Sequence, residues 1–159
     1  ICQTLQGGEK KVVVFFHYLG GIETMRKRLD EYHIGYDIIT GETHNRKRII
    51  EKFNTDEKCR VLMMTLKTGG VGLNLTVADT VFIYEPWWNK AAEIQGIDRL
   101  HRIGQKQKVF SYSIIATGSI EERILELQEL KTDLCNEIIR ADKNGGKLLT
   151  EEDMKYLLI

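Results

Sequence analysis

The chain has 159 residues, of which 42% are hydrophobic and 29% charged, with 14 glycines and one proline. This composition argues against a disordered or collagen-like chain, and the length allows one compact domain with a substantial hydrophobic core. The 23 basic and 23 acidic residues cancel, so any attraction to nucleic acid has to come from local clusters of charge.

A continuous β-branched and aromatic run, Lys11 to Phe16, indicates a strand buried on both faces of a parallel sheet. Four further strands are predicted at Tyr36 to Ile39, Arg60 to Met64, Thr80 to Tyr84 and Val109 to Ile115. The intervals between the first strands are long enough for crossover helices. Alternation of strands and helices therefore predicts an α/β sandwich.

Four main helices are predicted from apolar periodicity and capping residues. They cover Ile22 to Tyr32, Asn45 to Asn54, a third from an Asn89 cap to about Ile103, and a fourth from Ser119 to Arg140. Ser119 and Glu122 form a capping-box pattern at the start of the fourth. Its apolar stripe, which we expect to pack on another surface, contains Ile120, Ile124, Leu127, Leu130, Leu134 and Ile138. Thr150 can cap a short terminal helix, Glu151 to Leu158, expected to dock on the same body.

The three cysteines lie far apart and form no C-x-x-C pair, which argues against a zinc framework or a secreted disulfide lattice. A reducing compartment is the better expectation. The longest apolar run is too short to cross a bilayer, and no signal-peptide pattern is present. Because the chain starts at Ile1 rather than Met, we expect it to be a piece of a larger protein.

The segment Thr65 to Leu75, TLKTGGVGLNL, follows a buried strand and holds three glycines within four residues. Glycines let the backbone approach a ligand closely and expose its N–H groups, as in a phosphate or sugar cradle. The segment is not a P-loop, because the G-x-x-x-x-G-K-[ST] order is absent. On glycine content alone, a strained turn between strands is the favoured interpretation.

The segment QGIDRLHRIGQ places Gln95, Arg99 and Arg102 at spacings of four and three, on one face of a helix. Arginine suits a triphosphate because its rigid fork donates bidentate hydrogen bonds and stays charged. An equally favoured alternative is a solvated face on which these arginines pair with Glu93 or Asp98.

Both tryptophans and the proline stand together in Glu85 to Asn89, EPWWN, at a strand end. The tryptophans could stack on bases, although packing in the core is the favoured interpretation. Basic clusters at Arg26 to Arg28 and Arg46 to Arg48 are typical of solvated helix faces. The four histidines lack ligand partners at metal-binding spacing, and no nucleophile motif is present.

The order TLKTGGVGLNL, WWN, QGIDRLHRIGQ resembles motifs V, Va and VI of the Swi/Snf-like DNA translocases, which are superfamily-two ATPases. Upstream, KVVVFFHYLGGIETMRKRL resembles motif IV, and ITGETHNRKRIIEKFN resembles the motif that follows it. The resemblance extends downstream through GSIEERILELQELK and covers roughly residues 10 to 140.

This resemblance implies a RecA-like three-layer sandwich with a mainly parallel central sheet, followed by C-terminal helices. It divides the chain into an N-terminal extension (1–9), the second lobe of a two-lobe motor (10–118) and a helical extension (119–159). The first lobe, with its P-loop lysine and D-E-x-H box, is not in the sequence. ATP with Mg²⁺, held mainly by that first lobe, is the implied cofactor.

The resemblance also implies roles for single residues. Arg99 and Arg102 correspond to arginine fingers and Gln95 to a helper, while Gly70, Gly72 and Asn74 lie on the nucleotide side. The residues implied to face the DNA are Gly41, Arg46, Thr65, Lys67, Trp88 and Asn89. No metal ligand is implied in this lobe.

Three positions depart from the family pattern. Glu85 stands where the family usually has Asp, and Lys90 where it usually has Pro. The spacing from Gly41 to the next motif arginine is short, so either Arg46 or Arg48 matches that position.

The sequence thus predicts the C-terminal lobe of an ATP-dependent double-stranded DNA translocase of the chromatin-remodelling or DNA-repair type. Expected partners are double-stranded DNA, nucleosomes and the first lobe, with no membrane, in the nucleus of a eukaryote or otherwise in the cytoplasm. A dinucleotide-binding Rossmann-type domain is the first alternative, but Leu73 to Asp79 is too short for its crossover helix. A helical interaction module, the second alternative, would leave the motifs unexplained.

Overall fold

In this computed structural model the described residues are 5, 10–68, 73–85, 90–98, 100, 104, 105 and 107–143, with only the backbone described for 91, 92 and 135–143. Five strands form one parallel sheet in the order β2-β3-β1-β4-β5. The strands are β1 (Val12–Phe16), β2 (Gly35–Ile39), β3 (Cys59–Thr65), β4 (Thr80–Ile83) and β5 (Phe110–Ser113). The helices are α2 (Leu19–Glu31), α3 (Arg46–Thr55), α4 (Lys90–Ile97) and α5 (Ile120–Lys143).

Strand β1 occupies the centre of the sheet, between β3 and β4. Val12 pairs in register with Val61 on one side and with Thr80 on the other. All five residues of β1 are buried. The prediction that this apolar run is a strand covered on both faces is therefore confirmed, because a parallel sheet needs apolar side chains on each face.

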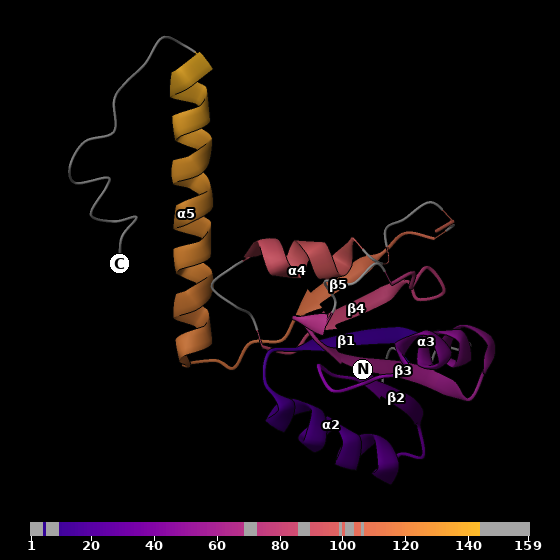
Figure 1. Cartoon of the computed structure of the whole chain (residues 1–159). Coiled ribbons are helices and arrows are strands. Elements are labelled where there is room, and N and C mark those ends of the chain that lie inside the picture. The colour runs from indigo at the N-terminus through magenta and orange to yellow at the C-terminus, as the bar shows by residue number, and fades with distance from the viewer. Residues whose placement is uncertain are drawn as a thin grey trace.

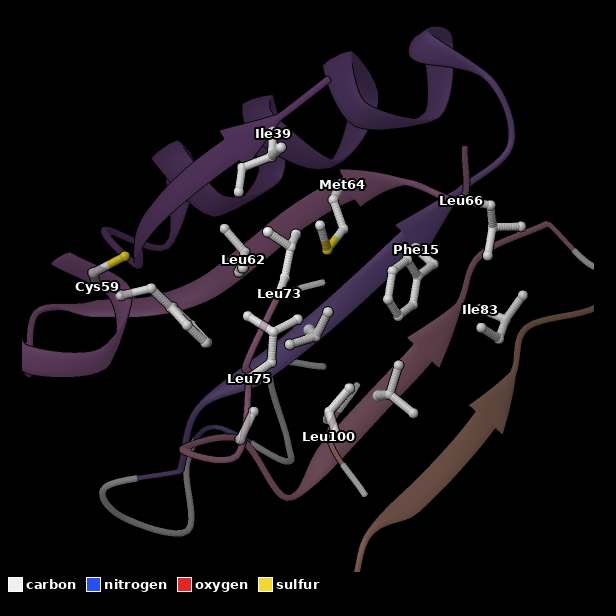
Figure 2. Close-up of a cluster of buried hydrophobic side chains, with 14 residues drawn as sticks. Phe15, Ile39, Cys59, Leu62, Met64, Leu66, Leu73, Leu75, Ile83 and Leu100 are labelled. Carbon is white, nitrogen blue, oxygen red and sulfur yellow. The ribbon is translucent and has the colours of Figure 1, made fainter. Parts of the chain in front are cut away.

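Helices cover both faces of the sheet, which gives the predicted three-layer α/β sandwich (Figure 1). On one face, Ile22 and Leu29 of α2 pack against Val12, Val14 and Phe16. On the other, Phe53 of α3 and Ile97 of α4 belong to a larger cluster around Phe15. Figure 2 shows Leu73, Leu75 and Leu100 completing this second cluster from segments outside the strands.

Lys11 precedes β1 and is buried, with 8% of its surface exposed. Its ammonium donates to the carbonyl of Phe53 and, at 2.9 Å, to that of Asp56, at the C-terminal end of α3. It also lies over the Phe53 ring, 5.2 Å from the ring centroid. Carbonyls at a helix C-terminus attract a cation, so this lysine links the start of β1 to the end of α3. Burial lowers the pKa of Lys11 from its usual value.

Strand β5 lies at the edge of the sheet and all four of its residues are exposed. The strand is shorter than the predicted range 109–115. The Tyr112 ring stacks on Phe82 of β4 at 5.2 Å between centroids, yet 49% of Tyr112 remains exposed. This edge of the fold therefore presents aromatic side chains to its surroundings.

Helix α5 begins directly after Ser119, as predicted, and extends away from the sheet (Figure 1). The Ser119 hydroxyl accepts the Glu121 N–H, while the Glu122 carboxylate accepts the Gly118 N–H, one residue before the position that a capping box requires. No described helix is long and apolar enough to cross a membrane.

Three members of the apolar stripe of α5 are exposed within this chain, so their packing on another surface stays a prediction. Ile120 is 71% exposed, Leu127 41% and Leu130 52%, whereas Ile124 is buried. An apolar stripe is covered only if another element reaches it, and sequence periodicity does not say which element that is. Ile138 and the predicted terminal helix, with its Thr150 cap, lie outside the described side chains.

Candidate functional site

Three loops leave the sheet at the same edge, because the carboxyl ends of parallel strands lie together. The Leu66 N–H donates to the Phe16 carbonyl, which joins the ends of β3 and β1, and the Tyr84 N–H donates to the Phe15 carbonyl from the end of β4, each at 2.9 Å. Open α/β sheets bind ligands at this carboxyl edge. The segments that follow β3 and β4 are the predicted glycine-rich and tryptophan-containing motifs.

Glu85 joins two of these loops. Its Oε2 accepts the N–H of His17 at 3.2 Å and that of Tyr18 at 3.0 Å, just before α2 begins. A carboxylate near a helix N-terminus is favourable because the helix dipole is positive there. Gly21 lets α2 approach closely, since a Cβ atom at that position would lie 2.7 Å from the Phe16 ring and 3.2 Å from Glu85. Sequence reasoning noted Glu85 as a departure from the family and missed this contact.

Burial lowers the pKa of His17 from its ordinary value. The Glu85 carboxylate partly opposes this shift, and the Lys67 ammonium adds to it. These influences show that charges from the ends of β3 and β4 both reach the end of β1. The edge of the sheet is therefore one electrostatic environment rather than three separate loops.

Thr65 is the last residue of β3, and Lys67 lies in the turn that follows. The Thr65 and Thr68 hydroxyls lie 2.9 Å apart, and the Thr68 hydroxyl donates to the Thr65 carbonyl at 2.7 Å. Lys67 is exposed, and within the described part of the chain it forms no ion pair. The turn is thus held by buried Thr68, while the lysine charge is directed toward the outside.

Gly41 and Arg46 lie in the loop between β2 and α3. Gly41 is exposed, whereas Arg46 is half-buried and bonds to backbone carbonyls of this loop. Arg46, but not Gly41, is among the residues that line a groove of about 950 Å³, together with Lys47, Arg48 and Asn74. The basic cluster on α3 therefore faces a concave surface, whereas Arg26 and Arg28 on α2 pair with acidic residues three positions away.

The predicted nucleotide-side residues are only partly within the described chain. Gln95 is exposed on α4, and Asn74 is exposed, its Oδ1 accepting the Thr76 N–H at 3.3 Å. Six of the predicted site residues lie outside the described residues: Gly70, Gly72, Trp88, Asn89, Arg99 and Arg102. The predicted Asn89 cap of the third helix lies outside them as well.

The third helix was expected to reach Ile103, and this is wrong, because α4 ends at Ile97. The Leu100 N–H donates to the Ile97 carbonyl, a tighter spacing than in an α-helix, and Leu100 is completely buried. The chain therefore turns at Leu100, whose side chain belongs to the core cluster. The predicted face with Gln95, Arg99 and Arg102 had assumed one unbroken helix.

Gln105, at the end of the same motif, was not singled out by sequence reasoning. Its side-chain amide donates to the carbonyls of Ala78 at 2.9 Å and Leu100 at 3.3 Å, and its Oε1 accepts the Gln107 N–H. Gly104, just before it, has φ of 110°, a conformation that favours glycine. Two described residues of this motif, Leu100 and Gln105, are thus joined to the core.

Cys59 is buried in the core cluster, as expected for a cysteine without a neighbouring base. Its Sγ donates to the Asp37 carboxylate at 3.2 Å. Burial, with that hydrogen bond, raises the pKa of the thiol to about 12, so it does not act as a nucleophile. Among the described residues, no group of three His, Cys, Asp or Glu side chains could hold a metal ion.

Comparison with known proteins identifies the fold and its motifs. The model of the helicase conserved C-terminal domain matches residues 1–104. This chain belongs to that family. An uncharacterized ATP-dependent helicase of Mycoplasma pneumoniae is 40% identical over 151 residues, which cover 94% of the chain and 15% of that protein.

Two further comparisons place this helicase domain in the Swi/Snf-like branch. A putative SWI/SNF-related matrix-associated actin-dependent regulator of chromatin, subfamily A member 3-like 1, of Arabidopsis thaliana is 45% identical over 116 residues, covering 71% of the chain and 13% of that protein. The crystal structure of the C-terminal part of the Fun30 ATPase domain matches with a TM-score of 0.72 and 29% identity, over 74% of this chain and 38% of that one. The predicted family and RecA-like fold are confirmed. The chain spans about a seventh of the length of these curated relatives.

Proposed function

We propose that, in the whole protein, this helicase domain is the second lobe of an ATP-driven translocase of double-stranded DNA, of the chromatin-remodelling or DNA-repair type. Membership of the helicase C-terminal family and relatives named as ATP-dependent helicases support ATP use. The observation that carries the proposal is the common edge at which the motif-bearing loops after β1, β3 and β4 leave the sheet, with the Lys67 charge directed outward.

On the nucleotide side, Arg99 and Arg102 would act as arginine fingers when the first lobe closes on this one with ATP bound. Their guanidinium groups suit the charge that develops on the γ-phosphate oxygens in the transition state. Gln95 would assist them, and Gly70, Gly72 and Asn74 would supply close backbone approach to the nucleotide. The Mg²⁺ that accompanies ATP would be held mainly by the first lobe.

On the DNA side, Thr65, Lys67, Gly41 and Arg46 would lie along one strand of the duplex, with Trp88 and Asn89 nearby. Such contacts go to phosphates and position the protein without reading sequence. A translocase needs this kind of contact because it has to move across any base sequence. Nucleosomes are the natural form of that DNA in a eukaryote, where the protein would be nuclear; in a bacterium it would be cytoplasmic.

Lys67→Glu in the intact protein tests the DNA side of this proposal. We expect weaker binding to double-stranded DNA and a slope of log affinity against log salt smaller by about 1, the effect of one lost phosphate contact. Lys27→Glu, an exposed lysine on α2, is the matched control with the same change of charge and should leave the slope unchanged. Equal effects of the two substitutions would mean that net charge, rather than a contact at the sheet edge, governs binding.

A further inference from the structure

Arg46 stands at the first position of α3, and its guanidinium bonds back to the loop that precedes the helix. Nε donates to the Thr43 carbonyl at 3.1 Å, and Nη2 donates to the carbonyls of Gly41 at 3.1 Å and Thr40 at 3.4 Å. The rigid fork of an arginine can hold several carbonyls at fixed positions, which a lysine ammonium on a flexible stem does less well. One side chain thus joins three of the four carbonyls from Thr40 to Thr43.

Thr43 closes the same loop through different atoms. Its N–H donates to the Thr40 carbonyl at 3.2 Å, and its hydroxyl oxygen accepts the Thr40 N–H at 2.9 Å. The Thr40 carbonyl therefore accepts from both Thr43 and Arg46. Because the two side chains share this acceptor, we expect their contributions to the shape of the loop to be coupled.

Gly41 lies within the loop that these contacts hold. A Cβ atom added there would meet nothing within 4 Å, and its φ is outside the left-handed region. Neither crowding nor backbone conformation in the described chain requires a glycine at this position. A glycine that faces open space permits an outside group to approach the backbone closely.

We infer that Arg46 is a positioning residue, which acts through the carbonyls of Thr40, Gly41 and Thr43 to present Gly41 to the DNA backbone. The neighbouring Lys47 and Arg48, which are exposed and line the groove, supply the positive charge that faces phosphate. The first turn of α3 contains no acidic residue, and Glu51, one turn further along, also lines the groove. This inference rests on the proposed function, and it assigns Arg46 and its neighbours different tasks at the DNA-facing surface.

Two substitutions in the intact protein separate positioning from direct phosphate binding. Arg46→Lys keeps the charge but loses the fork, and Thr43→Val removes the hydroxyl without any change of charge. If Arg46 positions the loop, both variants speed amide hydrogen exchange over residues 40–45 in the absence of DNA. Arg46→Lys also raises the DNA concentration for half-maximal ATP hydrolysis by about tenfold, the effect of losing one hydrogen bond to a charged group, and Thr43→Val raises it by about fivefold, the effect of losing a neutral one. The kcat at saturating DNA should stay near the parent value.

Lys47→Gln is the matched comparison, because it removes a charge from the adjacent exposed position. Lys47→Gln should raise the DNA concentration for half-maximal ATP hydrolysis and reduce the slope of log DNA affinity against log salt concentration. It should leave amide hydrogen exchange in residues 40–45 unchanged. The inference is overturned if Arg46→Lys behaves like the parent, if Thr43→Val has no effect on DNA, or if either variant only lowers the Tm. If DNA does not stimulate ATP hydrolysis by the parent protein, the proposed function is contradicted instead. The hydrogen-exchange measurement uses DNA-free protein, so its result does not depend on the proposed function.

Discussion

Single side chains at both ends of the parallel strands do more than their residue types indicate, Glu85 at the carboxyl end of β4 and Gln105 near its amino end. Glu85 bonds the backbone before α2, and Gln105 bonds backbone carbonyls of the core. The sequence shows that such residues are polar, but their partners lie from 5 to 68 positions away along the chain. Contacts of this kind depend on the tertiary fold, so neither spacing nor residue type predicts them.

His17 makes stability depend on pH in a definite direction. Its folded pKa is lowered by burial, so as the pH falls below about 6.5 the unfolded chain takes up the proton first. The stabilisation is complete above that pH and is lost as the pH falls through the folded pKa. We therefore expect the difference in unfolding free energy between the parent and His17→Gln to shrink from pH 7.5 to pH 5.

Urea unfolding of the chain at a series of pH values measures this difference. Lys67→Glu offers an independent comparison, because it replaces a cation that lowers the pKa of His17 with an anion that raises it. In the Lys67→Glu protein, the decrease in unfolding free energy due to His17 between pH 7.5 and pH 5 should be smaller. A parent-to-variant difference that stays constant with pH would show that His17 is not perturbed by its surroundings.

At the level of elements, the strands were predicted well because their apolar runs reflect burial on both faces. Four of the five predicted strands agree with the structure within one residue at each end, and β5 is shorter than predicted by one residue at its start and two at its end. Helix ends were harder to predict: α4 ends at Ile97 rather than near Ile103, and buried Leu100 follows in a turn. The stripe of α5 was recognised as apolar, but nothing in its period says that Ile120 and Leu130 stay exposed.

Substitution of Leu100 tests whether this residue anchors the arginine-containing motif to the core. Leu100 is completely buried in the core cluster, so Leu100→Ala should lower the free energy of unfolding by about 2–5 kcal/mol. Ile94→Ala, on the 51% exposed side chain of α4, is the control and should change it by less than about 0.5 kcal/mol. Denaturant unfolding of the chain gives both values. If Leu100→Ala changes the free energy of unfolding as little as Ile94→Ala does, the motif is not anchored through Leu100.

At the scale of the whole molecule, the described fold is that of a helicase C-terminal domain, and the predicted division into 1–9, 10–118 and 119–159 remains a prediction. The family was recognisable because motif strings combine many fixed positions in a fixed order. The roles of the site residues were less predictable, because the backbone partners of residues such as Arg46 and Asn74 follow from the fold of their loops rather than from residue type.

The chain alone should fold but hydrolyse no ATP. Phosphoryl transfer by P-loop enzymes needs a P-loop lysine and an acidic residue that holds the metal, and this sequence has no P-loop. Circular dichroism should show a cooperative unfolding transition, and phosphate release should stay at background with or without DNA. DNA-stimulated turnover by the purified chain would contradict the two-lobe account.

We propose that Arg99 and Arg102 complete a catalytic site shared with the first lobe. Arginine fingers contribute about 10³ to 10⁵ in rate, whereas an exposed ion pair is worth about 0–1 kcal/mol. The measurement is DNA-stimulated ATP hydrolysis by the intact protein carrying Arg99→Ala or Arg102→Ala, with DNA affinity measured alongside. The account predicts that turnover falls by about a thousandfold or more, that DNA affinity stays near that of the parent, and that lysine at either position restores little because it lacks the fork. Turnover within a few-fold of the parent in both alanine variants would contradict it.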